Sequence, residues 1–272
     1  LYTQGFLLQN CSFKSRGINP FFDTLIPGFM HVSVKTDEDG VEFRKEYRVL
    51  RTTERLNLPG IGRFKAAVIE EREIFGATPG ADPTVLRQIS INWYAICEET
   101  NGVYTVGENS FQLNDDGTVN NTEGTWRAGT VHPTRGIAIP AVAMPGTIFL
   151  GSRYIFDGAP GVALGGAEIV AYGLETVNGK LTTEETDFYD GEENIDIPIT
   201  AEVGEFSGCV QVEELSQFNE PPFALDAEDP TNKVWCPDVG LIYDTSDGAL
   251  AESNLLTDEE FMERVEEFKE DN

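Results

Sequence analysis

The stretch that decides the fold is LRQISINWYAICEETNGVYTVGE, residues 86–108. Residues 86–99 and 103–108 are rich in Ile, Val, Tyr and Trp, which favour β-strands. Thr100-Asn101-Gly102 separates them, and Asn-Gly supplies the positive φ angles that a tight hairpin turn requires. The stretch therefore predicts two antiparallel strands joined by a turn.

The same pattern recurs along the chain. Strand-like segments flank turn signals at residues 37–40, 116–117, 178–179 and 247–248. Many short strands separated by Gly-containing turns are typical of an antiparallel sandwich or a barrel-like sheet. We predict a mainly β protein with an irregular N-terminal segment over residues 1–28 and a single antiparallel β domain over residues 29–250.

One α-helix is predicted, over the acidic residues 251–272. Thr257 is a candidate N-cap, and Glu260 three residues later completes a capping box. Phe261, Val265 and Phe268 then recur at spacings of four and three, which places them on one helix face. We expect this face to dock on the protein's own sheet, with a neighbouring chain as the alternative.

The charge excludes whole classes of partner. The 272 residues include 19 Lys and Arg against 47 Asp and Glu, a formal net charge of −28. Such a field repels the phosphates of nucleic acids and the surfaces of anionic lipids. No apolar run reaches the length of about 20 residues that a transmembrane helix needs. We therefore predict neither nucleic-acid binding nor a membrane span.

The cysteine pattern favours disulfides over a metal site. No CxxC pair occurs, and two histidines are too few for a Cys/His zinc site of normal spacing. Widely spaced cysteines in an exported chain favour two disulfides, with four buried free thiols as the alternative. Three pairings are open, and closeness in sequence favours the third and fourth cysteine as one pair. The four residues are Cys11, Cys97, Cys209 and Cys236.

Other features concern processing and location. Because the sequence starts at Leu1 rather than Met, we expect a cleaved leader and an extracytoplasmic location: periplasm, cell surface or secreted. Cys11 follows Asn10, a poor fit to a lipoprotein acylation site, so we expect it to be unlipidated. Asn10 and Asn120 begin N-x-S/T sequons and are glycosylation candidates only in a host that glycosylates exported proteins.

Several phrases occur together in a familiar order. They are NPFFDTLIPG (19–28), NWYAICEETNGVYTVGE (92–108), EGTWRAGTVHPTRGIAIPA (123–141), GEFSGCVQVEE (204–214) and VWCPDVGLI (234–242). In this order they resemble a widespread group of bacterial exported proteins, many of them lipoproteins, over roughly residues 19–245. The sequence departs from the group at residues 235–238, where Trp-Cys-Pro-Asp replaces Tyr-Ala-Pro-Gly. The resemblance implies an exported β fold and carries no activity or catalytic residues.

No catalytic motif is evident. The chain has no G-x-S-x-G elbow, no HExxH motif and no nucleotide-binding glycine pattern. His31 lies in a strand-like segment and His132 in a Gly/Pro-rich loop, so both are expected to be structural or surface residues. We therefore predict no enzymatic activity, with a hydrolase that uses acidic residues kept as an alternative.

Calcium is the cofactor that the acidic residues suit best, because this hard cation takes six to eight oxygen ligands. Asp187, Asp190, Glu192, Glu193 and Asp196 form the main candidate site. Smaller clusters lie at residues 114–121 and 226–229. The competing interpretation of all three is a set of solvated acidic loops.

Three functions remain under consideration. The first is an exported, non-enzymatic protein that acts by binding or as a structural subunit of an extracellular assembly, through its N-terminal segment and C-terminal helix. The second is a carrier of an apolar ligand or lipid in a β cavity. The third is the hydrolase. Trp93, Tyr94, Trp126 and Trp235 are candidates for a ligand-stacking surface, with core packing as the alternative.

Overall fold

The computed structural model of this chain describes residues 8–22, 25–37, 39–134, 136–177, 180–182, 205–215, 231–246 and 248–255. One 3-10 turn, η1 (Leu8–Asn10), precedes the strands. The strands are β1 (Phe13–Lys14), β2 (Phe29–Thr36), β3 (Glu42–Leu58), β4 (Gly62–Gly76), β5 (Pro83–Cys97), β6 (Val103–Leu113), β7 (Val119–Asn121), β8 (Trp126–Arg127), β9 (Val131–His132), β10 (Gly136–Ile137), β11 (Ala141–Met144), β12 (Arg153–Ala159), β13 (Ala163–Val177), β14 (Lys180–Thr182), β15 (Cys209–Leu215), β16 (Thr231–Cys236), β17 (Gly240–Asp244) and β18 (Gly248–Leu255).

Nearly all of these strands belong to one antiparallel sheet. Its main path runs β11-β6-β5-β4-β3-β2-β18-β17-β16-β15-β13-β12, and β9 and β10 form a separate hairpin. The predicted mainly β, antiparallel architecture is confirmed. The predicted hairpin at residues 86–108 is formed by β5 and β6, and Asn101 in its turn has a φ of 58°.

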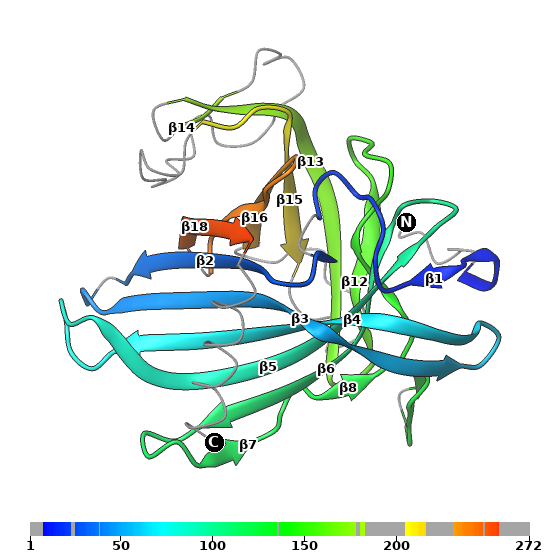
Figure 1. The fold of residues 1–272 in the computed structure, drawn as a ribbon, viewed down its shortest axis with the longest axis horizontal. Helices are drawn as coiled ribbons and strands as arrows, with labels where there is room; N and C mark the ends of the chain where they lie inside the picture. The colour runs from blue at the N-terminus through cyan, green and yellow to red at the C-terminus, as the bar shows by residue number, and fades with distance from the viewer. Residues whose placement is uncertain are drawn as a thin grey trace.

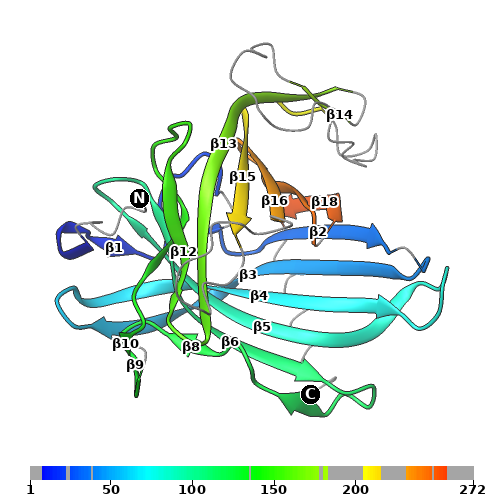
Figure 2. The same ribbon diagram turned by 180° about the vertical axis from the view of Figure 1, so that it is seen from behind.

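The sheet curls until its two ends meet. At one junction β2 pairs with β18, so the first long strand lies beside the last described strand. At the ends of the path, the Ile139 amide just before β11 donates a hydrogen bond of 2.9 Å to the Gly158 carbonyl on β12. In Figures 1 and 2, strands β2–β6 run side by side, and β12, β13 and β15 cross them at a steep angle. Two steeply crossed layers are a recurrent way of packing sheet faces.

Apolar side chains from both layers form the core. Trp93 and Val106 belong to the same buried cluster as Ile169 and Val212 from the crossing strands. Close approach of backbones adds a steric requirement at Gly146, where a Cβ would lie 1.7 Å from the Thr100 carbonyl oxygen. Only glycine fits there without moving the β5–β6 turn.

The predicted C-terminal α-helix is wrong. Residues 251–255, which we expected to begin it, continue strand β18, and Glu252 pairs in register with Val32 of β2. The part of the chain that the structure describes contains no α-helix. Residues 256–272, including the cap at Thr257 and the stripe of Phe261, Val265 and Phe268, lie outside the described residues. Pairing with a distant strand overrides the local helical pattern where β18 forms.

Two disulfides join the four cysteines. Cys209 pairs with Cys236 at a separation of 27 residues, which confirms the favoured pair, and Cys11 pairs with Cys97 at a separation of 86. No cysteine is free. The alternative of four free thiols is therefore wrong.

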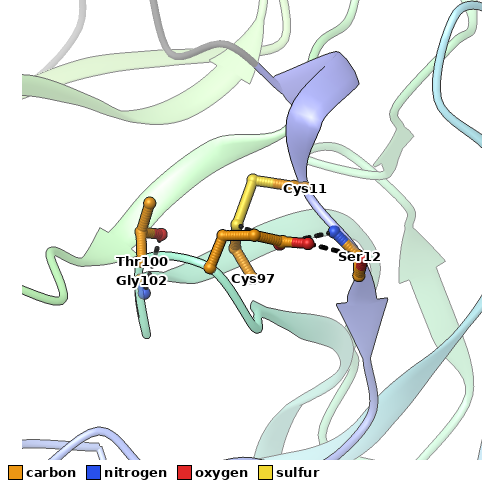
Figure 3. Close-up of a disulfide and its surroundings, with 6 residues drawn as sticks. Cys11, Ser12, Cys97, Thr100 and Gly102 are labelled. Atoms are coloured by element: carbon orange, nitrogen blue, oxygen red, sulfur yellow. Dashed lines mark hydrogen bonds between the residues drawn. A yellow bond between two sulfur atoms is a disulfide. The ribbon is translucent and has the colours of Figure 1, made fainter.

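The described part of the N-terminal segment is fixed to its own sheet. β1 pairs with β5 beside the Cys11–Cys97 disulfide, and Glu99 accepts hydrogen bonds of 2.7 and 2.6 Å from the amide and hydroxyl of Ser12 (Figure 3). The buried Asn19 side chain donates to the carbonyls of Asn101 and Pro145 at 2.8 and 3.1 Å. The predicted docking of this segment on a neighbouring chain would need the same residues, which here already contact the protein's own sheet.

Among the described residues, no helix has the length and hydropathy to cross a bilayer.

Candidate functional site

A cavity of about 250 Å³ lies on the inner face of the curled sheet. This volume is just below the range of about 300–1,000 Å³ typical of small-molecule sites, so it suits a compact ligand. Its lining combines apolar, aromatic and charged side chains from β2–β6, β11, β12 and β15–β17, together with Phe22. The described residues that line it are Phe22, Phe29, His31, Lys45, Tyr47, Val49, Ile69, Glu71, Gln88, Ser90, Asn92, Tyr94, Thr105, Glu108, Ala143, Phe156, Asp157, Glu214, Lys233, Trp235 and Leu241.

One wall is a row of polar side chains that crosses five neighbouring strands. The register places them side by side: His31 is opposite Tyr47, Tyr47 opposite Glu71, and Asn92 opposite Glu108. Asn92 Nδ2 also donates to Glu71 Oε1 at 2.8 Å. Alternation along each strand puts these side chains on the same face of the sheet. We call this row the polar row, meaning His31, Lys45, Tyr47, Glu71, Gln88, Ser90, Asn92 and Glu108.

The opposite wall comes from the crossing strands and is partly aromatic. Phe156 and Asp157 belong to β12, Glu214 to β15, and Lys233 and Trp235 to β16. The Trp235 ring stacks on Phe22, with centroids 5.2 Å apart and an interplanar angle of 21°. A second ring, Tyr94, lies 5.3 Å from Phe22. Three rings from separate parts of the chain therefore form one apolar surface beside the charged groups.

Both lysines of the cavity have carboxylate partners. Lys45 Nζ lies 3.6 Å from Glu71 and 3.4 Å from Glu73. On the other wall, Lys233 Nζ lies 2.7 Å from Glu214 and 3.4 Å from the buried Asp244. Ion pairs that are withdrawn from water keep their geometry, because separating the two partners would leave an unpaired charge in a poorly solvated site. These positive charges are therefore already neutralised within the protein.

Asp157 differs from the other cavity carboxyls. Its backbone pairs with Gly165 of β13, but its carboxyl group has no hydrogen-bond or ion-pair partner among the described residues. Burial, followed by the nearby charges of Glu214 and Glu108, raises its pKa from an ordinary 3.8 to about 7, against a smaller opposing effect of Lys233. A carboxyl whose pKa is raised this far changes its protonation near neutral pH, which is common at binding and catalytic sites.

Two neighbouring titratable groups, Glu108 and Tyr94, also have raised pKa values. Burial raises the pKa of Glu108, although a hydrogen bond from Ser90 and the charge of Lys45 oppose the shift. The pKa of Tyr94 is raised well above its usual range, mainly by burial and then by the charges of Glu71 and Glu108. Two titratable groups from neighbouring strands thus avoid the anionic form for the same physical reasons.

The two histidines occupy different settings. His31 is buried at the cavity, where its Nε2 lies 3.2 Å from the Ser33 hydroxyl and its ring meets Tyr47 edge to face. His132, in the β9–β10 hairpin, accepts a hydrogen bond of 3.2 Å from the Thr134 amide through Nδ1. His31 therefore belongs to the candidate site, and His132 is not among the described residues that line it.

None of the described residues that line the cavity is a predicted metal or glycosylation residue. The calcium candidates Asp187, Asp190, Glu192, Glu193 and Asp196 and the cluster at 226–229 are outside the described residues. In the cluster at 114–121, Asp116 accepts hydrogen bonds from the amide and hydroxyl of Thr118, as in an ordinary turn. Asn10 and Asn120 are exposed.

A search for metal ligands among the described residues finds one group, made of Cys11, Cys97 and Glu99. Its two sulfurs are bonded to each other, so they are not thiolates and cannot ligate a metal as thiolates do.

The aromatic candidates divide between core and cavity. Trp93 and Trp126 are 7% and 5% exposed and belong to the core, and Arg127 lies over the Trp93 ring at 4.6 Å. Tyr94 and Trp235 line the cavity. Core packing, the alternative interpretation, therefore holds for Trp93 and Trp126, and a ligand-stacking role for Tyr94 and Trp235 stays a prediction.

Sequence reasoning missed the charged residues of the cavity. Lys45 and Glu71 lie in strand segments where consecutive residues are charged, so both faces of these strands carry polar side chains. Glu46 and Glu70, their neighbours on the other face, are buried as well. Because side chains alternate between the two faces, the sequence alone does not show which of these charges line a cavity.

Comparison with protein-family models, curated proteins and solved structures finds no match for this chain.

Proposed function

We propose that this chain is a non-enzymatic, extracytoplasmic binding protein that carries a compact organic molecule in its cavity. The observation that carries the proposal is the partly polar cavity with an unpaired carboxyl at Asp157. Ligand sites typically combine an apolar lining with a few convergent polar groups. The charged lining favours an amphipathic ligand over the purely apolar ligand or lipid that was expected for a carrier.

The two disulfides support the extracytoplasmic part of the proposal. Structural disulfides persist in oxidising compartments and are rare in the cytosol. The similarity to bacterial exported proteins over residues 19–245 points in the same direction and stays a prediction.

A role as a subunit of an assembly has weaker support. The N-terminal segment was one of its two proposed contact elements, and residues 8–22 are tied to the sheet by the Cys11–Cys97 disulfide and by Asn19. The other element was the C-terminal helix, and residues 251–255 of it continue strand β18 instead. Carriage of a ligand is therefore the function that we put forward.

Native mass spectrometry of protein purified from its natural source tests the proposal. The expected result is an additional mass of a small organic molecule that leaves on mild activation. Ala143→Phe, which adds a ring to the cavity lining, should abolish this mass. Ala77→Phe, in an exposed loop, is the matched control and should retain it.

Circular dichroism must show that both variants are folded. A wild-type protein without an additional mass, whose melting temperature is also unchanged by a small-molecule extract of its source, would refute the carrier function.

A further inference from the structure

We propose that the cavity selects organic cations: a compact amine whose ammonium group pairs with Asp157 and whose apolar part lies against Phe156 and Trp235. This inference rests on the proposed carrier function and names the chemical class of its ligand.

The charges of the lining do not balance. Among the described residues that line the cavity, four are carboxylic acids and two are lysines. Each lysine is paired, with Glu71 on one wall and with Glu214 on the other. Two carboxyls, Asp157 and Glu108, remain without a lysine partner among the described residues, and Glu108 receives a hydrogen bond from Ser90. Asp157 is therefore the carboxyl beside which a ligand can supply a positive charge.

A metal ion fits this place poorly. Metal sites need carboxylate oxygens that converge, and the cavity carboxyls are not among the described groups of three whose ligand atoms lie within 4.8 Å of one another. An organic cation needs only one close carboxylate and tolerates the wider spacing of the others. An anion is disfavoured, because both lysines already have carboxylate partners and Asp157 would repel it.

The rings of the cavity suit the rest of such a ligand. Phe156 is a sequence neighbour of Asp157 and lines the same cavity, as do Tyr94 and the Trp235 ring that stacks on Phe22. Aromatic faces attract ammonium groups, and they also bury the apolar part of an amine. A carboxylate beside aromatic rings therefore discriminates an amine from an alcohol of the same size.

Binding of a cation to this site depends on pH. The groups that face Asp157 are Glu214 on β15, Glu108 on β6 and Lys233 on β16. Burial first, and then the charges of Glu214 and Glu108 against the opposing charge of Lys233, bring the pKa of Asp157 to about 7. An ammonium group binds the ionised carboxyl, so below about pH 7 uptake of the amine must displace a proton. We expect the affinity for an amine to be constant above this pH and to fall about tenfold per pH unit below it.

Calorimetric titration with three probes of one shape tests the inference: 2-phenylethylamine, 2-phenylethanol and 3-phenylpropionate. At pH 8 the amine should bind at least about tenfold more tightly than the alcohol, and the acid should bind weakest. Asp157→Asn should remove the preference for the amine and its dependence on pH. Asp82→Asn, which removes an exposed carboxyl from the β4–β5 loop, is the matched control and should leave both unchanged.

The outcomes separate this inference from the carrier function. An alcohol or an acid that binds as tightly as the amine overturns the cation selectivity and leaves the carrier function standing. A preference for the amine that survives Asp157→Asn overturns the role of Asp157. If no probe binds, the inference fails, and the mass measurement on Ala143→Phe decides the carrier function by itself.

Discussion

Replacing Asp157 by asparagine should stabilise the protein at neutral and alkaline pH. The carboxyl is forced to ionise in a place where burial and the charges of Glu214 and Glu108 oppose its negative charge. An amide has nearly the same shape and carries no charge. The variant therefore removes an electrostatic penalty while it keeps the shape of the cavity.

The size of the effect follows from the shift in pKa. Asp157 has a pKa of about 7 in the folded protein, against an ordinary value of 3.8. Each pKa unit corresponds to about 1.4 kcal/mol, so the penalty reaches about 4 kcal/mol. Between these two pKa values the folded protein binds more protons than the unfolded chain, so stability falls as the pH rises. The penalty is absent below about pH 4 and complete above about pH 7.

Urea unfolding followed by tryptophan fluorescence measures this difference. The free energy of unfolding of Asp157→Asn minus that of the wild type should grow by roughly 2–3 kcal/mol between pH 5 and pH 8. Asp82→Asn, which changes an exposed carboxyl, should show a difference that is small and independent of pH. A gain from Asp157→Asn that is equal at the two pH values, or a loss of stability at pH 8, would refute the reasoning.

Two further predictions concern the scaffold. Removing the Cys11–Cys97 disulfide by a double serine substitution should cost about 4–5 kcal/mol, and removing Cys209–Cys236 about 3–4 kcal/mol, because the first closes a loop of 86 residues and the second one of 27. Denaturant melts of the two double variants test the order, which a larger loss for the second pair would contradict. Gly146→Ala places a Cβ 1.7 Å from a backbone oxygen and should cost at least about 2 kcal/mol, measured by thermal unfolding; an unchanged melting temperature would show that the β5–β6 turn can move.

The features that the sequence predicted correctly are local ones. The hairpin at residues 86–108 depends on strand formers around Asn101, whose conformation the turn itself requires. The pairing of Cys209 with Cys236 follows from a short separation along the chain and a shared sheet, in which their strands are direct neighbours. Such signals are contained within a few dozen residues and need no knowledge of the tertiary structure.

The features that the sequence did not predict depend on distant contacts. Residues 251–255 form a strand because β2 offers them an edge, which no local pattern reveals. The cavity was missed for a related reason. Lys45 and Glu71 lie in strand segments that carry charges on both faces, and only the curling of the sheet decides which of these charges line the cavity. Asp157 gave no signal at all, since a single aspartate in a strand is unremarkable until its neighbours are known.

The pairing of β2 with β18 has a consequence for the order of folding. Phe29 lies opposite Leu255, so the sheet can close only after almost the whole described chain is available. Contacts between such distant residues make folding slow. Until residues 248–255 pair with β2, that strand has an unpaired edge to which strands of other chains can bind. The β2 edge carries no acidic residue, but the net charge of −28 makes two whole chains repel each other and so opposes such pairing before the sheet closes.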